Sequence, residues 1–197
     1  RARVSTNLDI LVLVDEQSEA RRAGGLKQIA FAEKIAALTP DILIGLIDEG
    51  AVLRIQRDKK TGILDVLISA LADKDARLAV FTAIAAFPAG PELETLISQT
   101  QIARHFATWA NSDPPSALAW YREQEQFGKF NPLTTTNDSG PIKTFKAPMI
   151  RALAGTDDKE VVKIFLQSNE RERSALLHDA LRRINPTSDP ASSNIAI

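Results

Sequence analysis

The residues of this chain with the widest range of chemistry are its two histidines, because an imidazole acts as acid, base or metal ligand near neutral pH. His105 precedes Trp109 by four residues, so the two rings should share one flank of a helix. We interpret His105 as half of a stacked pair at the edge of an apolar stripe. His178 has Leu177 and Asp179 beside it, and neither histidine has a second ligand at metal-binding spacing. The sequence predicts no metal site and no cofactor.

Pairs of carboxylates are the other candidates for acid–base chemistry. Glu92 and Glu94 are separated by one residue, and Asp157 and Asp158 are adjacent. All of them fall where a helix is expected to begin, and the helix dipole favours negative charge there. Helix capping therefore explains them better than proton transfer does. The chain also lacks cysteine, a Gly-x-Ser-x-Gly turn and a glycine-rich phosphate loop. We predict that the protein is not an enzyme and has no catalytic residues.

Arginines interleave with acidic residues toward the end of the chain: Arg171, Arg173, Arg182 and Arg183 lie among Glu170, Glu172 and Asp179. The plainer interpretation is a helix face covered by salt bridges. The sharper one is a site for an anion or a peptide carboxylate, because a guanidinium binds a carboxylate through two parallel hydrogen bonds. Arg171, Arg173 and Arg182 are the residues that we predict to bind a partner.

Composition restricts the possible partners and the fold class. The chain has 197 residues, of which 44% are hydrophobic and 25% charged, with a net charge of −1. Acidic and basic residues are mixed, so the strong positive field that attracts nucleic acid or an anionic membrane is missing. The most apolar run, residues 78–89, is about half of the roughly 20 residues that a membrane span needs. Few aromatic residues and abundant Ala, Leu and Ile favour an all-α fold.

The stretch with the clearest pattern is residues 100–127, which we call the Trp hairpin: two short helices around a Ser-Asp-Pro-Pro turn. Apolar residues recur at helical spacing in both limbs, at Ile102, Ala103, Phe106, Ala107 and Ala110 and then at Ala117, Leu118 and Tyr121. Asp113 is a natural N-cap for the N–H of Ser116, and Pro114 suits the first helical position. The turn should therefore end one helix and begin the next.

Helical spacing also runs through the beginning of the chain. A short helix is predicted near residues 8–14 and a longer one at about 19–38, which Gly24 and Gly25 weaken. Either the backbone bends at these glycines or a neighbouring helix approaches closely there. Thr39 and Pro40 should start the next helix, and Gly50 is placed to end it.

The most buried part of the protein is predicted in the next hairpin. The charged segment 57–62 is most simply a solvated loop. After it, residues 63–72 and 76–87 are apolar nearly all round, which indicates helices covered on several sides. Residues 91–98 form a further short helix that leads into the Trp hairpin.

The helical pattern lapses after Phe127. Residues 128–147 are rich in Thr, Asn, Pro and Gly, and a structureless segment of this length is unusual inside a compact domain. Four apolar side chains should hold its limbs against the surface: Phe130, Leu133, Ile142 and Phe145. Residues 134–140 are then left as a mobile tip.

Helical spacing returns after this segment. Residues 148–154 and 159–167 read as helices, and Asp157 followed by Glu160 resembles a capping box at the start of the second. A longer helix is expected at 169–184. Asp189 then opens a final pair that the chain does not finish.

Acidic residues at the expected helix starts recur at a regular interval. Asp41, Asp75, Asp113, Asp158 and Asp189 are 34, 38, 45 and 31 residues apart by subtraction. This is the period of stacked helical hairpins, in which each unit buries its apolar face against its neighbours. The predicted fold is an all-α, right-handed α-solenoid-like array of antiparallel hairpins, similar to tetratricopeptide or HEAT repeats, with one long irregular loop.

Residues 100–190 resemble the degenerate W-x3-DP-x2-A-x2-W helical repeats of large uncharacterised proteins from Verrucomicrobia and Planctomycetes. The matching positions are Trp109, Asp113, Pro114, Ala117 and Trp120, and the later unit has Asp157-Asp158 where Asp-Pro is usual. The resemblance implies an α-solenoid in which these residues are structural, and it identifies no catalytic residue. It also implies an extracytoplasmic part of an anchored bacterial protein.

Two functions follow from these observations. We expect a single helical-repeat domain with N-terminal hairpins (1–99), the Trp hairpin (100–127), a long loop (128–147) and C-terminal hairpins (148–197). The first hypothesis is a non-catalytic scaffold that binds a protein or peptide along a groove between hairpins. The alternative is a small-molecule sensor or an enzyme with a pocket under the 128–147 loop, because long ordered loops are often functional. An enclosed pocket with converging polar groups under that loop would favour the alternative.

Overall fold

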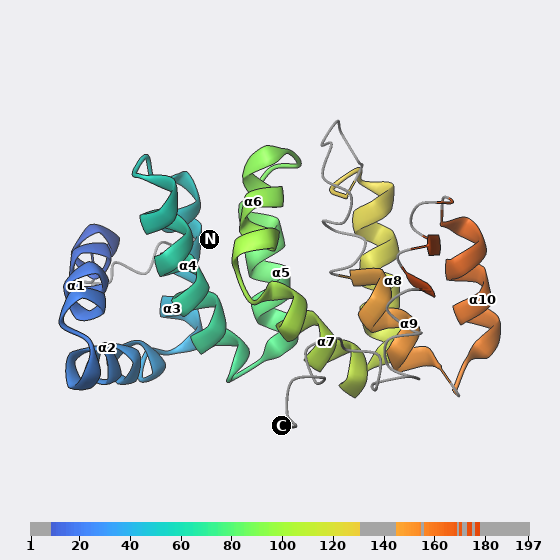
Figure 1. Cartoon of the computed structure of the whole chain (residues 1–197), viewed down its shortest axis with the longest axis horizontal. Coiled ribbons are helices and arrows are strands. Elements are labelled where there is room, and N and C mark those ends of the chain that lie inside the picture. Colours follow the sequence, from blue (N-terminus) through green and yellow to red (C-terminus); the bar gives the residue numbers. More distant parts are fainter. Residues whose placement is uncertain are drawn as a thin grey trace, which may run out of the picture.

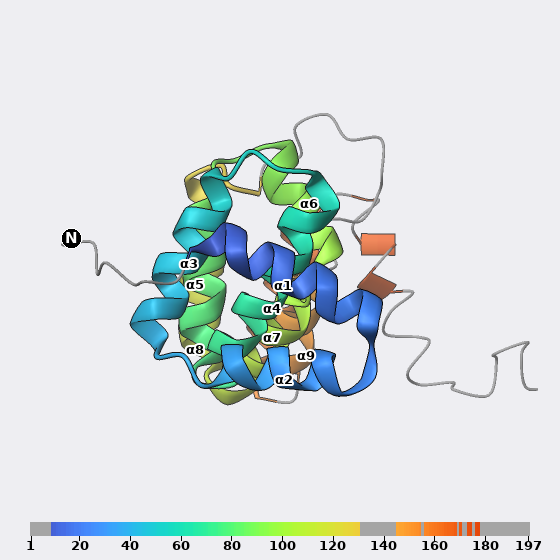
Figure 2. The same cartoon turned by 90° about the vertical axis from the view of Figure 1, so that its left-hand side faces the viewer.

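The structure, a computed structural model, is all-helical (Figure 1). It describes residues 9–130, 145–154, 156–168, 170, 173–174 and 176–177, and these form ten helices and no strand. The helices follow one another along the long axis of the molecule, from α1 and α2 at one end to α10 at the other (Figure 1). Seen from the end in Figure 2, α1 and α2 lie in front of the remaining helices. The predicted all-α class is confirmed.

The first two helices meet at a glycine pair. Helix α1 spans Ile10–Ala23 and α2 spans Gly25–Ala36. Gly24 and Gly25 have φ angles of 63° and 49°, which L side chains rarely adopt. The chain therefore turns at the glycine pair, so the predicted helix at 19–38 is divided between α1 and α2. Of the two explanations that the sequence left open for these glycines, the structure shows a change of backbone direction. The first helix also extends to Ala23, beyond the predicted residues 8–14. Asp9 caps its start by accepting a hydrogen bond from the N–H of Leu11 at 2.8 Å.

Helix α3 spans Pro40–Val52, and Thr39 is its N-cap residue without a side-chain capping bond. Gly50 does not end this helix, contrary to the prediction. It lies inside the last turn and is buried. A Cβ atom at this position would lie 2.9 Å from Leu64 Cδ2 and 3.0 Å from Ile10 Cδ1. Gly50 therefore allows α3 to approach α4 and α1 closely.

Helix α4 spans Arg57–Ala72, so residues 57–62 are helical and not the predicted solvated loop. The reason is tertiary, because Thr61 and Gly62 are buried although their neighbours are charged. The side chain of Gln17, itself buried in α1, donates a hydrogen bond to the carbonyl of Gly62 at 2.8 Å. This contact with α1 gives the charged turn a buried side.

Helix α5 spans Ala76–Ala86 and packs against both α4 and α3. Asp75 caps it by accepting a hydrogen bond from Leu78 N at 2.9 Å. The α4–α5 pair supplies many of the fully buried aliphatic side chains, among them Ile63, Leu67 and Val80. The prediction of a well-covered hairpin here is confirmed.

Helices α6 (Pro91–Gln99), α7 (Ile102–Ser112) and α8 (Pro114–Gln126) follow. Asp113 lies between α7 and α8, and its Oδ1 accepts a hydrogen bond from Ser116 N at 3.2 Å. Pro114 is the first residue of α8. The predicted cap is therefore confirmed. Ala117 is buried on α8, as its helical spacing indicated.

Seven aromatic rings form a cluster around the Trp hairpin: Phe81, Phe106, Trp109, Trp120, Tyr121, Phe130 and Phe145. The ring centroids of Trp109 and Trp120 are 5.4 Å apart. The ring centroid of Phe145 lies 4.9 Å from those of both Phe106 and Phe130, and Phe145 is fully buried. Offset and edge-on ring pairs of this kind add stability beyond area burial.

The two ends of the long irregular segment are held in this cluster through Phe130 and Phe145, as predicted. Leu133, Ile142 and the expected tip at 134–140 lie outside the described residues. Lys129 adds a polar anchor, since its ammonium donates hydrogen bonds to the carbonyls of Phe87 and, at 3.1 Å, Ile84 at the end of α5. Positive charge is favoured at a helix C-terminus.

Helices α9 (Ala147–Leu153) and α10 (Asp158–Gln167) complete the described helices. Asp157 caps α10 by accepting a hydrogen bond from the N–H of Glu160 at 3.1 Å, so that predicted start is confirmed. Most of the expected helix at 169–184, and Asp189, lie outside the described residues. None of the helices described here is both long and apolar enough to cross a membrane.

Candidate functional site

His105 lies at the contact between α7 and α4. The residue is only 9% exposed, and its Nε2 lies 3.2 Å from Ser69 Oγ. Burial lowers the pKa of His105 below its usual value of 6.5, although the carboxylates of Asp65 and Asp73 act in the opposite direction. The hydrogen-bond partner comes from another helix, which the spacing along α7 does not reveal. Neither His105 nor Ser69 lines either of the two grooves described below.

The other candidates for chemistry are dispersed. Glu92 and Glu94 lie in the first turn of α6, and Asp158 in that of α10, where the helix dipole favours them. Within the described part of the chain, no three His, Asp or Glu side chains are grouped as a metal site would require. His178 is not among the described residues.

Only part of the predicted arginine cluster lies among the residues that the structure describes. Arg171, Arg182 and Arg183 lie outside the described residues, and Arg173 is half-buried after α10. Partner binding by Arg171, Arg173 and Arg182 stays a prediction.

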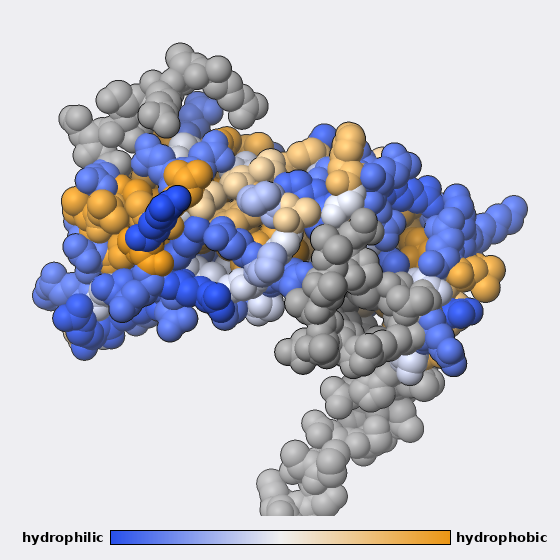
Figure 3. Space-filling view, turned by 90° about the horizontal axis from the view of Figure 1, so that it is seen from above, coloured by the Kyte–Doolittle hydropathy of each residue, from blue (hydrophilic) through white to orange (hydrophobic). Residues whose placement is uncertain are grey.

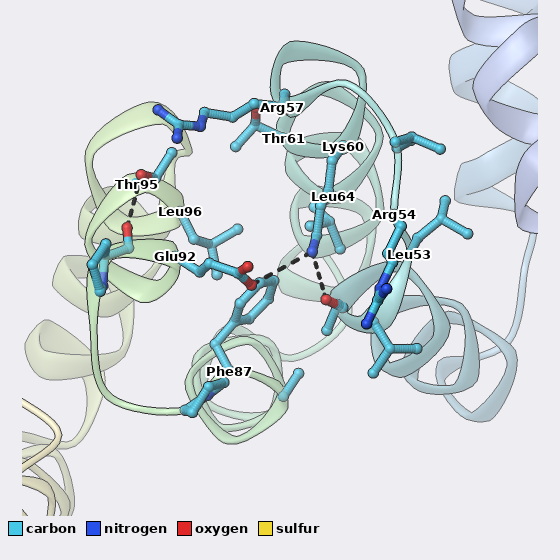
Figure 4. A pocket seen from close by; sticks show the side chains of 16 residues that line it. Leu53, Arg54, Arg57, Lys60, Thr61, Leu64, Phe87, Glu92, Thr95 and Leu96 are labelled. Carbon is cyan, nitrogen blue, oxygen red and sulfur yellow. Dashed lines mark hydrogen bonds and ion pairs between the residues drawn. The ribbon is translucent and has the colours of Figure 1, made fainter.

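A groove, which we call the α4–α6 groove, opens between α6 and the segment that joins α3 to α4 (Figure 4). Its volume is about 530 Å³, within the range that holds small molecules or short peptide segments. From above, Figure 3 shows apolar residues, orange to tan, among the hydrophilic residues, in blue, over the half of the molecule that contains this groove.

The lining of the α4–α6 groove is apolar at its base. Leu64, Phe87 and Leu96 supply buried side chains from three different helix regions. Leu53 and Ile55, in the segment between α3 and α4, are half-buried. Val52 is 78% exposed at the rim. A large apolar side chain entering the groove would bury this surface and remove its own surface from water.

Lys60 projects into the groove from the first turn of α4 (Figure 4). Its Nζ donates a hydrogen bond to the carbonyl of Ala51 at 2.6 Å, lies 3.7 Å from Glu92 Oε2, and lies 5.4 Å from the ring centroid of Phe87. The Lys60 side chain is 16% exposed. These contacts fix the position of a positive charge inside the groove and link α3, α4 and α6.

Two more cations line the same groove. Arg54 precedes α4, and Arg57 is its first residue. Both are exposed, and neither guanidinium makes a hydrogen bond or an ion pair within the described residues. The charged residues of the lining are Arg54, Arg57, Lys60 and Glu92, which leaves a net charge of +2 by counting three cations and one carboxylate.

Sequence reasoning missed this site because it assigned residues 57–62 to a solvated loop. The spacing of Arg57 and Lys60, three positions apart, would have placed both on one helix face once the segment was read as helical. Their approach to Glu92 and Leu96 depends on packing between α4 and α6 and has no local signal.

A second groove, the α8–α10 groove, lies between α8 and α10 and has a volume of about 480 Å³. Its lining is more polar, and each of its charged side chains belongs to an ion pair. Arg122 forms an ion pair with Glu160, and Lys146 Nζ lies 3.6 Å from Glu125 Oε1. Lys146 is buried at the end of the long irregular segment.

Comparison with known proteins adds no assignment to these grooves. No protein-family model, no curated protein and no solved structure matches the chain. The residues that carry the resemblance to the W-x3-DP repeats have structural positions here, with Trp109 and Trp120 buried and Asp113 acting as a helix cap. The inference about function therefore rests on the geometry and charge of the two grooves.

Proposed function

We propose that this chain is a non-catalytic helical-repeat module that binds a protein or peptide segment in the α4–α6 groove. The observation that carries the proposal is the groove itself, which is open to solvent, apolar at its base and cationic at its rim. Interfaces generally combine an apolar centre with a polar, solvent-accessible rim. The α4–α6 groove has both parts on a single surface.

The order of helix contacts supports an α-solenoid-like array, the architecture that the resemblance to the W-x3-DP repeats implies. Helix α4 packs on α3 and α5, α5 on α7, α7 on α8 and α9, and α9 on α10. Contacts therefore pass mainly between helices that are near one another in the chain, which is typical of repeat proteins. The groove lies between neighbouring units of this series, where such arrays commonly bind extended segments.

The chemistry of the lining supports a non-catalytic role. Its hydroxyl groups belong to Thr61 and Thr95, which donate hydrogen bonds to the carbonyls of Arg57 at 2.6 Å and Pro91 at 2.8 Å. The groove has no histidine, and Glu92, its one carboxylate, lies beside Lys60. A general base or an activated nucleophile is therefore not assembled in this lining.

A matched pair of substitutions tests the proposal. Thr95→Trp places a large side chain in the groove, whereas Thr108→Trp changes an exposed threonine on α7 outside it. Both threonines donate to the carbonyl four residues earlier, Thr108 to Arg104 at 3.1 Å, so their local settings are alike. Peptides are selected from a displayed random library on the wild-type protein, and their affinities are measured by fluorescence anisotropy.

The expected result is that selected peptides bind the Thr108→Trp variant as they bind wild type and bind Thr95→Trp at least about tenfold more weakly, a loss of about 1.4 kcal/mol. Failure to select any peptide, or equal affinity for both variants, would refute binding in this groove.

The alternative function is a small-molecule sensor or an enzyme domain with its pocket under the 128–147 loop. The observation that favours it is the α8–α10 groove, which includes Lys146 at the end of that segment. A metabolite that raises the unfolding temperature of wild type but not of an Arg122→Ala variant would support the alternative.

A further inference from the structure

We propose that the natural occupant of the α4–α6 groove is an acidic peptide segment, with a large apolar side chain at the base of the groove and carboxylates on Arg54 and Arg57. This inference rests on the proposed function, and it specifies the chemical class of the partner. Two properties of the groove carry it: the cations at its mouth, which are unpaired among the described residues, and the apolar surface between them.

The cations are placed where they repel one another. Arg57, Lys59 and Lys60 all lie in the first turn of α4, whose dipole is positive at that end. Only Asp58 offsets them within the turn, and the N-cap residue Gln56 makes no side-chain capping bond. Such an arrangement does not help α4 to form. Positive charge at this position is therefore better explained by binding a negative group.

The three cations of the groove differ in what holds them. Lys60 is already held by the carbonyl of Ala51, the carboxylate of Glu92 and the ring of Phe87. It therefore contributes a positive charge at a fixed position in the groove. In the part of the chain that the structure describes, Arg54 and Arg57 have no such partners. In Figure 4 the Arg57 side chain extends toward Thr95 on α6, and Arg54 lies near Leu53 on the other side of the groove. Two separated guanidinium groups suit two separated carboxylates.

The apolar base selects a peptide over a phosphate-rich polymer. Leu64, Phe87 and Leu96 offer no hydrogen-bond donor to a phosphate or a base edge. Glu92, 68% exposed along its side chain, adds a negative charge that opposes a dense row of phosphates. A peptide satisfies both parts, because it alternates apolar and charged side chains along one backbone.

The test begins with random hexapeptides displayed with both blocked and free C-termini. After selection on wild type, the enriched peptides are expected to contain Asp or Glu together with Leu, Ile, Met or Phe. Enrichment confined to free C-termini would assign the carboxylate to the chain end, and enrichment in blocked peptides would assign it to side chains. Both results support the proposal, since the recognised chemistry is the same.

Affinities of the consensus hexapeptide, with its C-terminus free or blocked according to which form was enriched, then separate specific from general electrostatic attraction. Replacing its Glu residues by Gln, or making Arg54→Glu and Arg57→Glu in the protein, should weaken binding at least about tenfold, and raising the salt concentration should weaken it further. Lys59→Glu is the matched control, because Lys59 lies in the same turn of α4 but does not line the groove. It should change affinity less than about twofold.

Three outcomes would overturn the acidic-peptide assignment alone, and a fourth would also overturn the proposed function. One is enrichment of neutral or basic peptides whose binding is still lost in Thr95→Trp, which would leave the proposed function standing. Another is an equal loss of affinity in Lys59→Glu, which would mean non-specific charge attraction. The last is an oligothymidylate that binds more tightly than the consensus peptide. Selection of no groove-dependent peptide at all would overturn both the assignment and the proposed function.

Discussion

His105 Nε2 and Ser69 Oγ lie 3.2 Å apart, and this contact joins α7 to α4 across a buried helix interface. It fixes the ring of a titratable residue inside the protein and away from both grooves. A serine beside a histidine is the arrangement used for nucleophilic catalysis, but here neither side chain lines the α4–α6 groove or the α8–α10 groove. We interpret the pair as a structural contact with a consequence for stability in acid.

The stability of the protein should fall as the pH drops below the ordinary pKa of histidine. Burial lowers the pKa of His105 in the folded state from 6.5, so the unfolded chain binds the proton more readily. The stabilisation is therefore fully present above about pH 6.5 and is lost as the pH falls from there through the folded-state pKa. Urea unfolding of wild type and of His105→Gln, measured from about pH 7.5 to about pH 5, checks this. Parallel curves for the two proteins would contradict it.

The cap at the Trp hairpin should contribute measurable stability. Asp113→Ala removes the acceptor of the Ser116 N–H bond and should lower the free energy of unfolding by about 0.5 to 2 kcal/mol. Asp113→Asn keeps a side-chain oxygen and is the control, with a smaller loss expected. An unchanged urea midpoint for Asp113→Ala would show that the bond has no energetic role.

Two glycines of α3 should respond oppositely to the same substitution. Gly45→Ala meets no atom within 4 Å, so the helix propensity of alanine should stabilise the protein by about 0.5 to 1 kcal/mol. Gly50→Ala would meet Leu64 and Ile10 at or below 3.0 Å and should lose that gain or destabilise the protein. Thermal unfolding of both variants gives the comparison, and an equal increase in stability would disprove the close packing at Gly50.

The aromatic cluster should hold the end of the irregular segment firmly. Phe145→Ala deletes a fully buried ring that contacts Phe106 and Phe130, and a loss of about 3 to 5 kcal/mol is expected. Phe127, which is 74% exposed, provides the control, because Phe127→Ala should change stability by less than about 0.5 kcal/mol. Denaturant titration of both variants measures the difference. Similar losses would mean that the cluster is not the anchor.

Local features explain what could be predicted from the sequence. The Trp hairpin was recognisable because Asp113, Pro114 and the apolar spacing on each side act within a few residues of one another. The α4–α5 pair was recognisable because its residues are apolar on every face. In both cases the residues that reveal the element in the sequence are the same residues that stabilise it in the structure.

The incorrect predictions concern residues whose structure is decided by distant contacts. Residues 57–62 look like a loop because they are charged, yet Gln17 of α1 covers Gly62 and makes the turn part of α4. Gly50 looks like a helix end, yet it is needed for the approach of Leu64. The candidate site depends on the first of these, because Arg57 and Lys60 face α6 only when that turn is helical.

Methyl NMR during titration with a selected peptide tests the central claim most directly, because it locates the bound segment on the protein. Peptide binding in the α4–α6 groove predicts shifts in the methyl signals of residues that line it, among them Val52, Leu53, Leu64 and Leu96. Leu118 and Ile164, which line the α8–α10 groove, should not shift. Shifts at Leu118 and Ile164 without change at Leu64 and Leu96 would contradict the account and would move the binding site to the other groove.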